Sequence, residues 1–182
     1  MKILVIYYTK TGNTKQLGEA IHEIASIHHN STILPLKKVS LEILNDYNLL
    51  FIGAPCHHST LAGPMLKFLK TLPNSPSFKF AGFYTHSTTL PEGTERNKQL
   101  FEEWAGKCHP LFEKTAKDKN IEFLGDFNCQ GSASFLIEKF IHAKIVTDKD
   151  EWIPYKKEMR KHPTQADLDD AQKFAQNVLN KL

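Results

Sequence analysis

The residues best suited to chemistry lie near the start of the chain, in the hexapeptide Thr9-Lys-Thr-Gly-Asn-Thr14. Its threonine hydroxyls and its side-chain amide can donate hydrogen bonds, and Gly12 permits a tight turn with no side chain to block close approach. The peptide follows the apolar run Ile3–Tyr8 and precedes apolar residues at helical spacing from Leu17 onward. A helix beginning here adds unpaired backbone N–H groups and the positive end of its dipole. The pattern therefore predicts an anion site, most simply for a phosphate group.

Alternative roles suit the hexapeptide less well. Helix capping also favours Ser, Thr and Asn, but it would account for one threonine rather than the whole peptide, whereas Lys10 either adds charge or faces solvent. The chain lacks both G-x-x-x-x-G-K-[ST] and G-x-G-x-x-G, so the nucleoside triphosphate and dinucleotide fingerprints are absent. A response-regulator receiver is excluded because Tyr7-Tyr8-Thr9 supplies no acidic metal ligand at the end of the first strand.

Strand and helix signals alternate along the rest of the chain. Apolar runs rich in β-formers indicate strands, and amphipathic spacing indicates helices after them. The expected strands are Ile3–Tyr8, Thr32–Leu36, Leu49–Ile52, Phe78–Thr85 and Ile121–Cys129. The expected helices begin near Asn13 and near Pro64, span Leu100–Thr115 with a kink or split at Pro110, and end the chain behind Thr164 and Asp167, which stand at capping-box spacing.

This alternation predicts an α/β fold: a three-layer, doubly wound, five-stranded parallel sheet in the order 2-1-3-4-5. Pro35 cannot donate to a strand ladder, and this order places its strand at an edge. The 182 residues, 41% of them hydrophobic, suit one domain over residues 1–182 with an unassigned insertion around 131–161. Within the insertion, Phe135–Ile145 is compatible with a strand, a helix or a covering loop, and the basic segment Lys144–His162 with a solvated loop rather than a docking patch.

Composition excludes several classes of protein. A formal charge of +3 is far from the dense basic patches that nucleic-acid binding requires, so we expect no nucleic-acid partner. No run approaches the roughly 18 apolar residues of a membrane span, and residues 1–8 lack the features of a secretory signal. The three cysteines are widely spaced with no C-x-x-C pair, which argues against a disulfide framework or a zinc knuckle. We therefore expect a cytoplasmic protein.

Thr9-x-Thr11-Gly12-Asn13-Thr14 after an N-terminal apolar strand resembles the FMN phosphate loop of the flavodoxin family. The resemblance extends to Phe51–Pro55, Pro64–Phe68 and His162–Asp170, and so covers most of the chain outside 131–161. It implies a flavodoxin-like fold that holds one FMN. By this resemblance the phosphate is held by Thr9, Lys10, Thr11, Gly12, Asn13 and Thr14. The isoalloxazine is flanked by Pro55, Cys56, His57, His58, Ser59, Thr60, Leu61, Ala62 and Gly63, and by Thr85, His86 and Ser87.

The chain departs from the family at the second loop, where flavodoxins commonly place an aromatic ring and this sequence has Cys56-His57-His58. Neither ring-flanking loop offers Trp or Tyr. A histidine can stack on the flavin, and a protonated one would favour the anionic reduced form and raise the reduction potential. Adjacent residues cannot easily turn three ligands toward one ion, so we expect no metal site. We expect Cys129 to be a small buried hydrophobe, and no pattern identifies a catalytic acid, base or nucleophile.

Three functions fit these observations. The first is a flavodoxin-type carrier that moves electrons between a redox partner protein and an acceptor, although carriers of this kind are usually acidic and this chain is mildly basic. The second is an FMN-dependent NAD(P)H reductase of quinones or other small acceptors, for which the small residues of the second loop leave an open flavin face. The third is a binding module that has kept the fold and lost the flavin, against which the intact threonine-rich loop argues. Oligomeric state is left open by the sequence.

Overall fold

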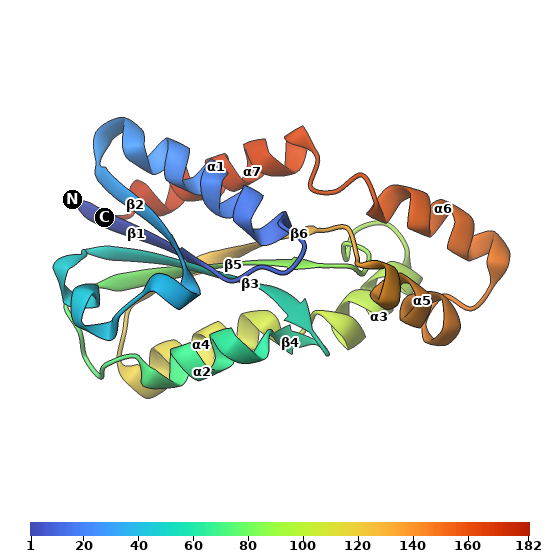
Figure 1. Cartoon of the computed structure of the whole chain (residues 1–182), viewed down its shortest axis with the longest axis horizontal. Coiled ribbons are helices and arrows are strands. Elements are labelled where there is room, and N and C mark those ends of the chain that lie inside the picture. The colour runs from blue at the N-terminus through green and yellow to red at the C-terminus, as the bar shows by residue number, and fades with distance from the viewer.

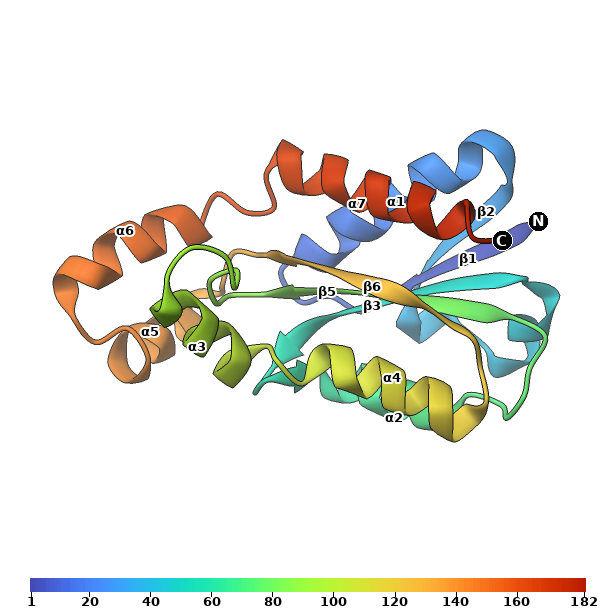
Figure 2. The same ribbon diagram turned by 180° about the vertical axis from the view of Figure 1, so that it is seen from behind.

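The computed structural model describes residues 1–182, and its centre is a parallel sheet covered by helices on both faces (Figures 1 and 2). The strands are ordered β2-β1-β3-β5-β6, which confirms the predicted order 2-1-3-4-5 once one additional short strand is numbered. In sheet order they are β2 (Asn30–Pro35), β1 (Lys2–Tyr7), β3 (Leu49–His57), β5 (Lys79–His86) and β6 (Phe123–Gln130). As predicted, β2 lies at an edge, and Pro35 is its last residue.

One strand, β4 (Thr60–Leu61), is additional to the predicted five-stranded parallel sheet. It pairs antiparallel with the end of β3, with Cys56 opposite Leu61 and His57 opposite Thr60. The two residues between the strands, His58 and Ser59, have φ angles of 52° and 69°. Two-residue hairpin turns of type I′ need this left-handed conformation, usually from Asn-Gly or Asp-Gly. Because neither residue here is a glycine or an asparagine, the sequence alone did not indicate a hairpin turn at this place.

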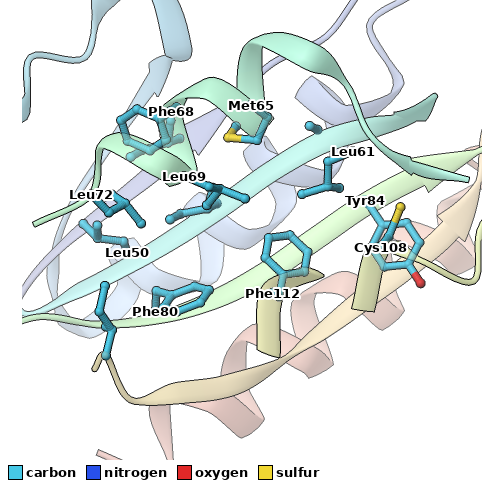
Figure 3. Packing of buried hydrophobic residues seen from close by; sticks show 14 of the residues in the cluster. Leu50, Leu61, Met65, Phe68, Leu69, Leu72, Phe80, Tyr84, Cys108 and Phe112 are labelled. Atoms are coloured by element: carbon cyan, nitrogen blue, oxygen red, sulfur yellow. The ribbon is translucent and has the colours of Figure 1, made fainter. Parts of the chain in front are cut away.

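Two helical layers enclose the sheet. On one face lie α1 (Asn13–His28) and α7 (Gln165–Leu179), and on the other lie α2 (Gly63–Thr71) and α4 (Cys108–Lys119) (Figures 1 and 2). Ile3 and Val5 of β1 pack in the first layer, whereas Leu4 and Ile6 pack in the second. The second layer is shown in Figure 3, where Phe112 of α4 lies against Phe80 of β5. Burial on both faces explains why these strands are continuous apolar runs.

The helix boundaries follow local signals, with one correction. Thr164 and Asp167 form the predicted capping box at the start of α7. The predicted long helix is split into α3 (Glu95–Trp104) and α4, but Pro110 does not cause the split. It lies in the first turn of α4, where its missing N–H leaves no bond unmade, and the break falls at residues 105–107. Two short 3₁₀ helices, η1 (Leu36–Lys38) and η2 (Leu41–Asp46), connect β2 to β3.

The insertion folds as two helices, α5 (Phe135–Lys144) and α6 (Lys149–Met159), beyond the carboxyl ends of the strands (Figures 1 and 2). The expectation of a solvated loop over the basic segment was wrong, because Trp152 is only 8% exposed and stacks on His142 with ring centroids 4.9 Å apart. Buried Glu138 of α5 accepts hydrogen bonds at 2.6 and 2.7 Å from Arg160, just after α6. These contacts hold the two helices together. None of the helices has both the length and the apolar character needed to cross a membrane.

Candidate functional site

A cavity of about 620 Å³ opens at the carboxyl ends of the parallel strands, which is where sheets of this kind bind ligands. The loops after β1, β3, β5 and β6 contribute to its wall, together with α5, the end of α3 and Tyr155 of α6. Of the residues predicted from the sequence, the cavity is lined by Lys10, Thr11, Asn13, Pro55, Cys56, His57, His58, Thr85, His86 and Ser87. The predicted residues outside this wall are Thr9, Gly12, Thr14, Ser59, Thr60, Leu61, Ala62 and Gly63.

The loop after β1 presents hydrogen-bond donors without partners. Gly12 has φ 97° and immediately precedes α1, and its N–H donates to Thr9 Oγ1 at 3.0 Å. A side chain built on Gly12 would meet no atom within 4 Å. Across residues 9–15 the Gly12 N–H has an acceptor in the protein, and those of Thr9, Lys10, Thr11, Asn13, Thr14 and Lys15 have none. Together with the positive end of the helix dipole, they form a site for an anion.

Two side chains that we expected to donate to a phosphate are instead engaged within the protein. Thr14 is fully buried, with its hydroxyl 2.9 Å from that of Thr85 at the end of β5. The Asn13 amide donates to the Ser132 carbonyl at 2.8 Å and accepts from the Ser132 hydroxyl at 3.1 Å. The Thr11 hydroxyl has no protein partner. Asn13 and Thr14 therefore position the loop, while the backbone and Thr11 supply its free donors.

Gly131 and Ser132 complete this end of the site, and sequence reasoning missed both. A Cβ atom on Gly131 would lie 2.7 Å from the Asn13 amide nitrogen, so only glycine leaves room for the Asn13–Ser132 pair. The position of Gly131 just after an expected strand was the signal that could have indicated a ligand-side turn. Its partner Asn13 lies more than a hundred residues earlier in the chain.

The second loop is the hairpin of β3 and β4. The Cys56 thiol donates to the Trp104 carbonyl at 3.2 Å, and the Ser59 carbonyl accepts from the Lys107 N–H at 3.0 Å. Burial lowers the pKa of the His57 imidazole, and the nearby Lys10 ammonium lowers it further. His57 is therefore largely neutral at pH 7, and the positive charge that we considered for this histidine comes from Lys10.

The third loop follows β5, and His86 ends that strand with only 3% of its surface exposed. Its Nδ1 lies 3.1 Å from the Thr88 carbonyl oxygen, and its Nε2 lies 3.1 Å from the Asn128 Oδ1 oxygen. Burial lowers the pKa of His86 to about 4, so the ring is neutral at pH 7. A neutral ring has one N–H, so it donates to one of these two acceptor oxygens at a time. His86 thus fixes the strand end and carries no charge into the cavity.

Aromatic rings line the cavity, although the two predicted ring-flanking loops contain no Trp or Tyr. They are Trp104 at the end of α3, Phe140 of α5 and Tyr155 of α6. Trp104 and Phe140 meet edge to face with centroids 5.8 Å apart, and the Tyr155 hydroxyl donates to the Ser87 carbonyl. None of these residues lies in the loops that carry the family pattern, so no local sequence signal assigned them to the site.

The cavity therefore has two chemically distinct ends. One end offers backbone donors for a phosphate and no carboxylate, and the other is apolar and aromatic, as a planar ring system requires. An FMN molecule, with a phosphate at one end and an isoalloxazine at the other, fits both.

Comparisons with known proteins agree with this geometry. An uncharacterized protein of Methanocaldococcus jannaschii is 24% identical over 184 residues, covering 98% of this chain and 99% of that protein. The solved structure of an archaeal flavodoxin has a TM-score of 0.63 at 17% identity, covering 100% of this chain and 98% of its own. Oxidised flavodoxin 1 of Bacillus cereus has a TM-score of 0.65 at 12% identity, with coverages of 100% and 99%.

A similar domain also occurs within a larger protein. Rubredoxin oxygen:oxidoreductase of Desulfovibrio gigas has a TM-score of 0.66 at 10% identity, and the match covers 99% of this chain but 35% of that protein. The model of the flavodoxin domain family matches residues 4–176, nearly the whole chain. The chain therefore belongs to the flavodoxin family, a membership that implies that it binds FMN and transfers electrons.

Proposed function

We propose that this protein is an electron carrier that holds FMN in the cavity and exchanges electrons with a separate redox partner protein. The observation that carries the proposal is the apolar rim on the ring side of the cavity, where Leu136, Ile137 and Phe140 of α5 are 75%, 48% and 40% exposed. Solvent-exposed apolar side chains beside a cofactor site are typical of a docking surface. A partner that covers this rim would come close to the flavin edge.

Different residues would bind the phosphate and the ring of FMN. Bound FMN supplies one- and two-electron chemistry. The unpaired N–H groups at the start of α1 hold its phosphate, and Trp104 and Tyr155 bound the space for its ring. Lys10 places a positive charge at the wall, which stabilises a more negative state of the cofactor.

Two buried titratable groups beside the cavity also favour a carrier over an enzyme. His86 is neutral with both ring nitrogens facing protein oxygens, and burial raises the pKa of Tyr155 to about 12 while its hydroxyl is bonded to Ser87. Neither group is available as an acid or base for a substrate. This agrees with a protein that transfers electrons and does not make or break covalent bonds in a substrate.

An NAD(P)H reductase of small acceptors is the second candidate, and one observation favours it. Trp104, Leu136 and Phe140 form an apolar shelf inside the cavity wall, and a quinone ring could stack there once FMN is bound. The flavin-less binding module has no such support, because the backbone donors of the phosphate loop are free.

Oxidation of NADPH and NADH by the FMN-loaded protein separates the two candidates. A carrier reduced chemically should pass electrons to a one-electron acceptor such as cytochrome c, yet should not oxidise either nucleotide without an added reductase. Rapid nucleotide oxidation that a quinone accelerates would overturn the carrier proposal. Failure of FMN to bind would overturn both candidates.

The compartment and the partner follow from the same proposal. Cys56, Cys108 and Cys129 are all free thiols, which suits a reducing compartment such as the cytoplasm. A mildly basic carrier would not be steered electrostatically onto basic partners. We therefore propose that docking depends on the apolar rim, and that the partner is a redox protein or a small electron acceptor.

A further inference from the structure

Helix α5 carries an apolar surface that the rest of the protein leaves uncovered. Phe135, Leu136, Ile137 and Phe140 are exposed, whereas the inward side of the helix is buried. The helix projects beyond the carboxyl ends of the strands (Figures 1 and 2), and Leu136, Ile137 and Phe140 also line the cavity. Contiguous exposed apolar side chains mark an interaction site. A molecule that covers this surface would lie at the cofactor site.

Two lysines border the apolar surface of α5. The Lys139 Nζ atom lies over the face of the Phe135 ring, 4.5 Å from its centroid. Lys144 follows Phe140 by four residues, and residues at this spacing lie on the same side of a helix. Both lysines are exposed, and neither forms an ion pair. The apolar surface is therefore accompanied by two free positive charges.

The neighbouring helix α6 repeats this pattern. Lys149, Ile153 and Lys157 are four residues apart, so they form one stripe along the helix, and all three are exposed. Neither of these lysines has a carboxylate partner. Exposed apolar and cationic side chains therefore occur together on both helices of the insertion.

The carboxylates of the insertion do little to offset these charges. Buried Glu138 accepts hydrogen bonds from Arg160 at 2.6 and 2.7 Å. The other engaged carboxylates are those of Glu151 with Arg96, Glu158 with Lys161, and Asp148 with the first N–H groups of α6. Asp150 alone has no partner. The free charge on the surface of the insertion is therefore predominantly positive.

The lip of the cavity formed by α3 has the opposite charge. Glu102 and Glu103 are exposed and form no ion pair, and they precede Trp104, whose ring meets Phe140. A protein that covers the opening would therefore meet free carboxylates on the α3 side and free lysines on the α5 side. Because the exposed apolar surface belongs to α5, the lysines are the charges that border the contact.

We propose that α5 docks an acidic redox protein, which is the partner required by the carrier function proposed above and on which this assignment rests. Apolar side chains of the partner cover Phe135, Leu136, Ile137 and Phe140, and carboxylates around them pair with Lys139 and Lys144. Such an arrangement, with an apolar centre and a charged rim, is usual for protein interfaces. Complementary charge accelerates encounter with the acidic protein and disfavours basic competitors.

Electron transfer to two forms of one acceptor tests the charge of the partner. Native cytochrome c is basic, and succinylation of its lysines makes the same haem protein acidic. The chemically reduced, FMN-loaded protein should reduce the succinylated form at least about tenfold faster than the native form at low salt, and added salt should remove the difference. Each rate is expressed relative to the rate with benzoquinone, an uncharged acceptor.

The double variant Lys139→Glu/Lys144→Glu reverses the two charges that border the apolar surface. It should lower the ratio of the succinylated rate to the native rate at least about tenfold. Lys67→Glu/Lys70→Glu is the matched control, because both lysines are exposed on α2, form no ion pair and lie outside the cavity wall. It changes the net charge equally and should alter the ratio no more than about twofold.

The possible outcomes separate this assignment from the carrier function. Equal rates with the two forms of cytochrome c, or equal losses in the two double variants, would overturn the acidic partner and leave the carrier function standing. Reduction of benzoquinone but of neither form of cytochrome c would overturn the carrier function itself. Apolar and basic helices also bind anionic lipid. Sedimentation of the wild type, but not of Lys139→Glu/Lys144→Glu, with phosphatidylglycerol vesicles would assign the surface to a membrane and overturn the proposal.

Discussion

The two ends of the cavity are built in different ways. The phosphate end is a short continuous peptide between a central strand and a helix, and its donors are backbone groups that the helix itself leaves unpaired. The ring end is assembled from α3, α5 and α6, which reach the site from distant parts of the chain. One end is fixed by local geometry, and the other depends on tertiary contacts.

Because the two ends are built differently, we expect substitutions at each end to affect different properties of the protein. Changes at the phosphate end should alter whether FMN binds, because free donors there have no substitute. Changes at the ring end should alter the environment and the access of the flavin while binding survives. The Asn13–Ser132 pair ties the start of α1 to the residues that lead into the insertion, and the Thr14–Thr85 hydroxyl pair ties it to the end of β5.

Gly12→Asp at the phosphate end is the substitution that we expect to have the largest effect. The new carboxylate would lie at the unpaired N–H groups, where it would occupy donors and repel a phosphate. We expect FMN affinity to fall at least about a thousandfold, or about 4 kcal/mol, as measured by titration of the apoprotein followed by flavin fluorescence.

Gly125→Asp is the matched control for this change. Gly125 lies in β6 outside the cavity wall, and like Gly12 it has a positive φ, 107°, with open space for a side chain, so both substitutions carry the same kind of backbone strain. Its affinity for FMN should stay within a few-fold of the wild type. Equal losses in the two variants would mean that the start of α1 holds no phosphate.

The same division explains how much the sequence could predict. The sheet order followed from strand runs and from Pro35, and a loop with free donors at the start of α1 followed from Thr9–Thr14, since both signals are local. The helices of the insertion could not be predicted in this way, because α5 carries four apolar residues that are exposed: Phe135, Leu136, Ile137 and Phe140. Their pattern therefore shows no clean helical face. Trp104 and Tyr155 join the site only through packing, which no sequence spacing records.

His86 provides a pH test of the ring end. Its folded pKa of about 4 lies below its unfolded value of 6.5, so the folded protein binds fewer protons than the unfolded chain between these values. Stability should consequently fall as the pH drops from 6.5 to 4, by up to about 3 kcal/mol from this residue. Urea unfolding across that range should show the slope, and His86→Gln should flatten it even if it lowers stability throughout.

His28→Gln is the control for this prediction, because His28 is exposed at the end of α1 and has no buried bonds to lose. It should leave the pH dependence unchanged. An unaltered slope in His86→Gln, or a flattened slope in the control, would show that His86 is not the buried neutral group.

Asn13→Ala tests the tie between the start of α1 and the residues that lead into the insertion. The substitution keeps the backbone N–H of the phosphate loop but leaves the Ser132 carbonyl without its partner, so we expect a loss of about 1–2 kcal/mol in unfolding free energy. Ser132→Ala removes only one of the two bonds and should cost less. A double-mutant cycle by urea unfolding measures the coupling, and strictly additive losses would mean that the pair joins nothing.

Leu136→Gln on the rim should have the smallest effect on stability. This variant distinguishes a loss of partner docking from a loss of stability. Leu136 is 75% exposed, so its substitution should change the unfolding free energy by no more than about 0.5 kcal/mol. Ile27→Gln, at a residue of α1 that is 60% exposed and lies outside the cavity wall, should change it equally little. If the rim is a docking surface, only Leu136→Gln should slow electron transfer to a protein acceptor in stopped-flow experiments, and both variants should reduce ferricyanide at the wild-type rate. Equal rates with the protein acceptor would mean that partners reach the flavin by another face.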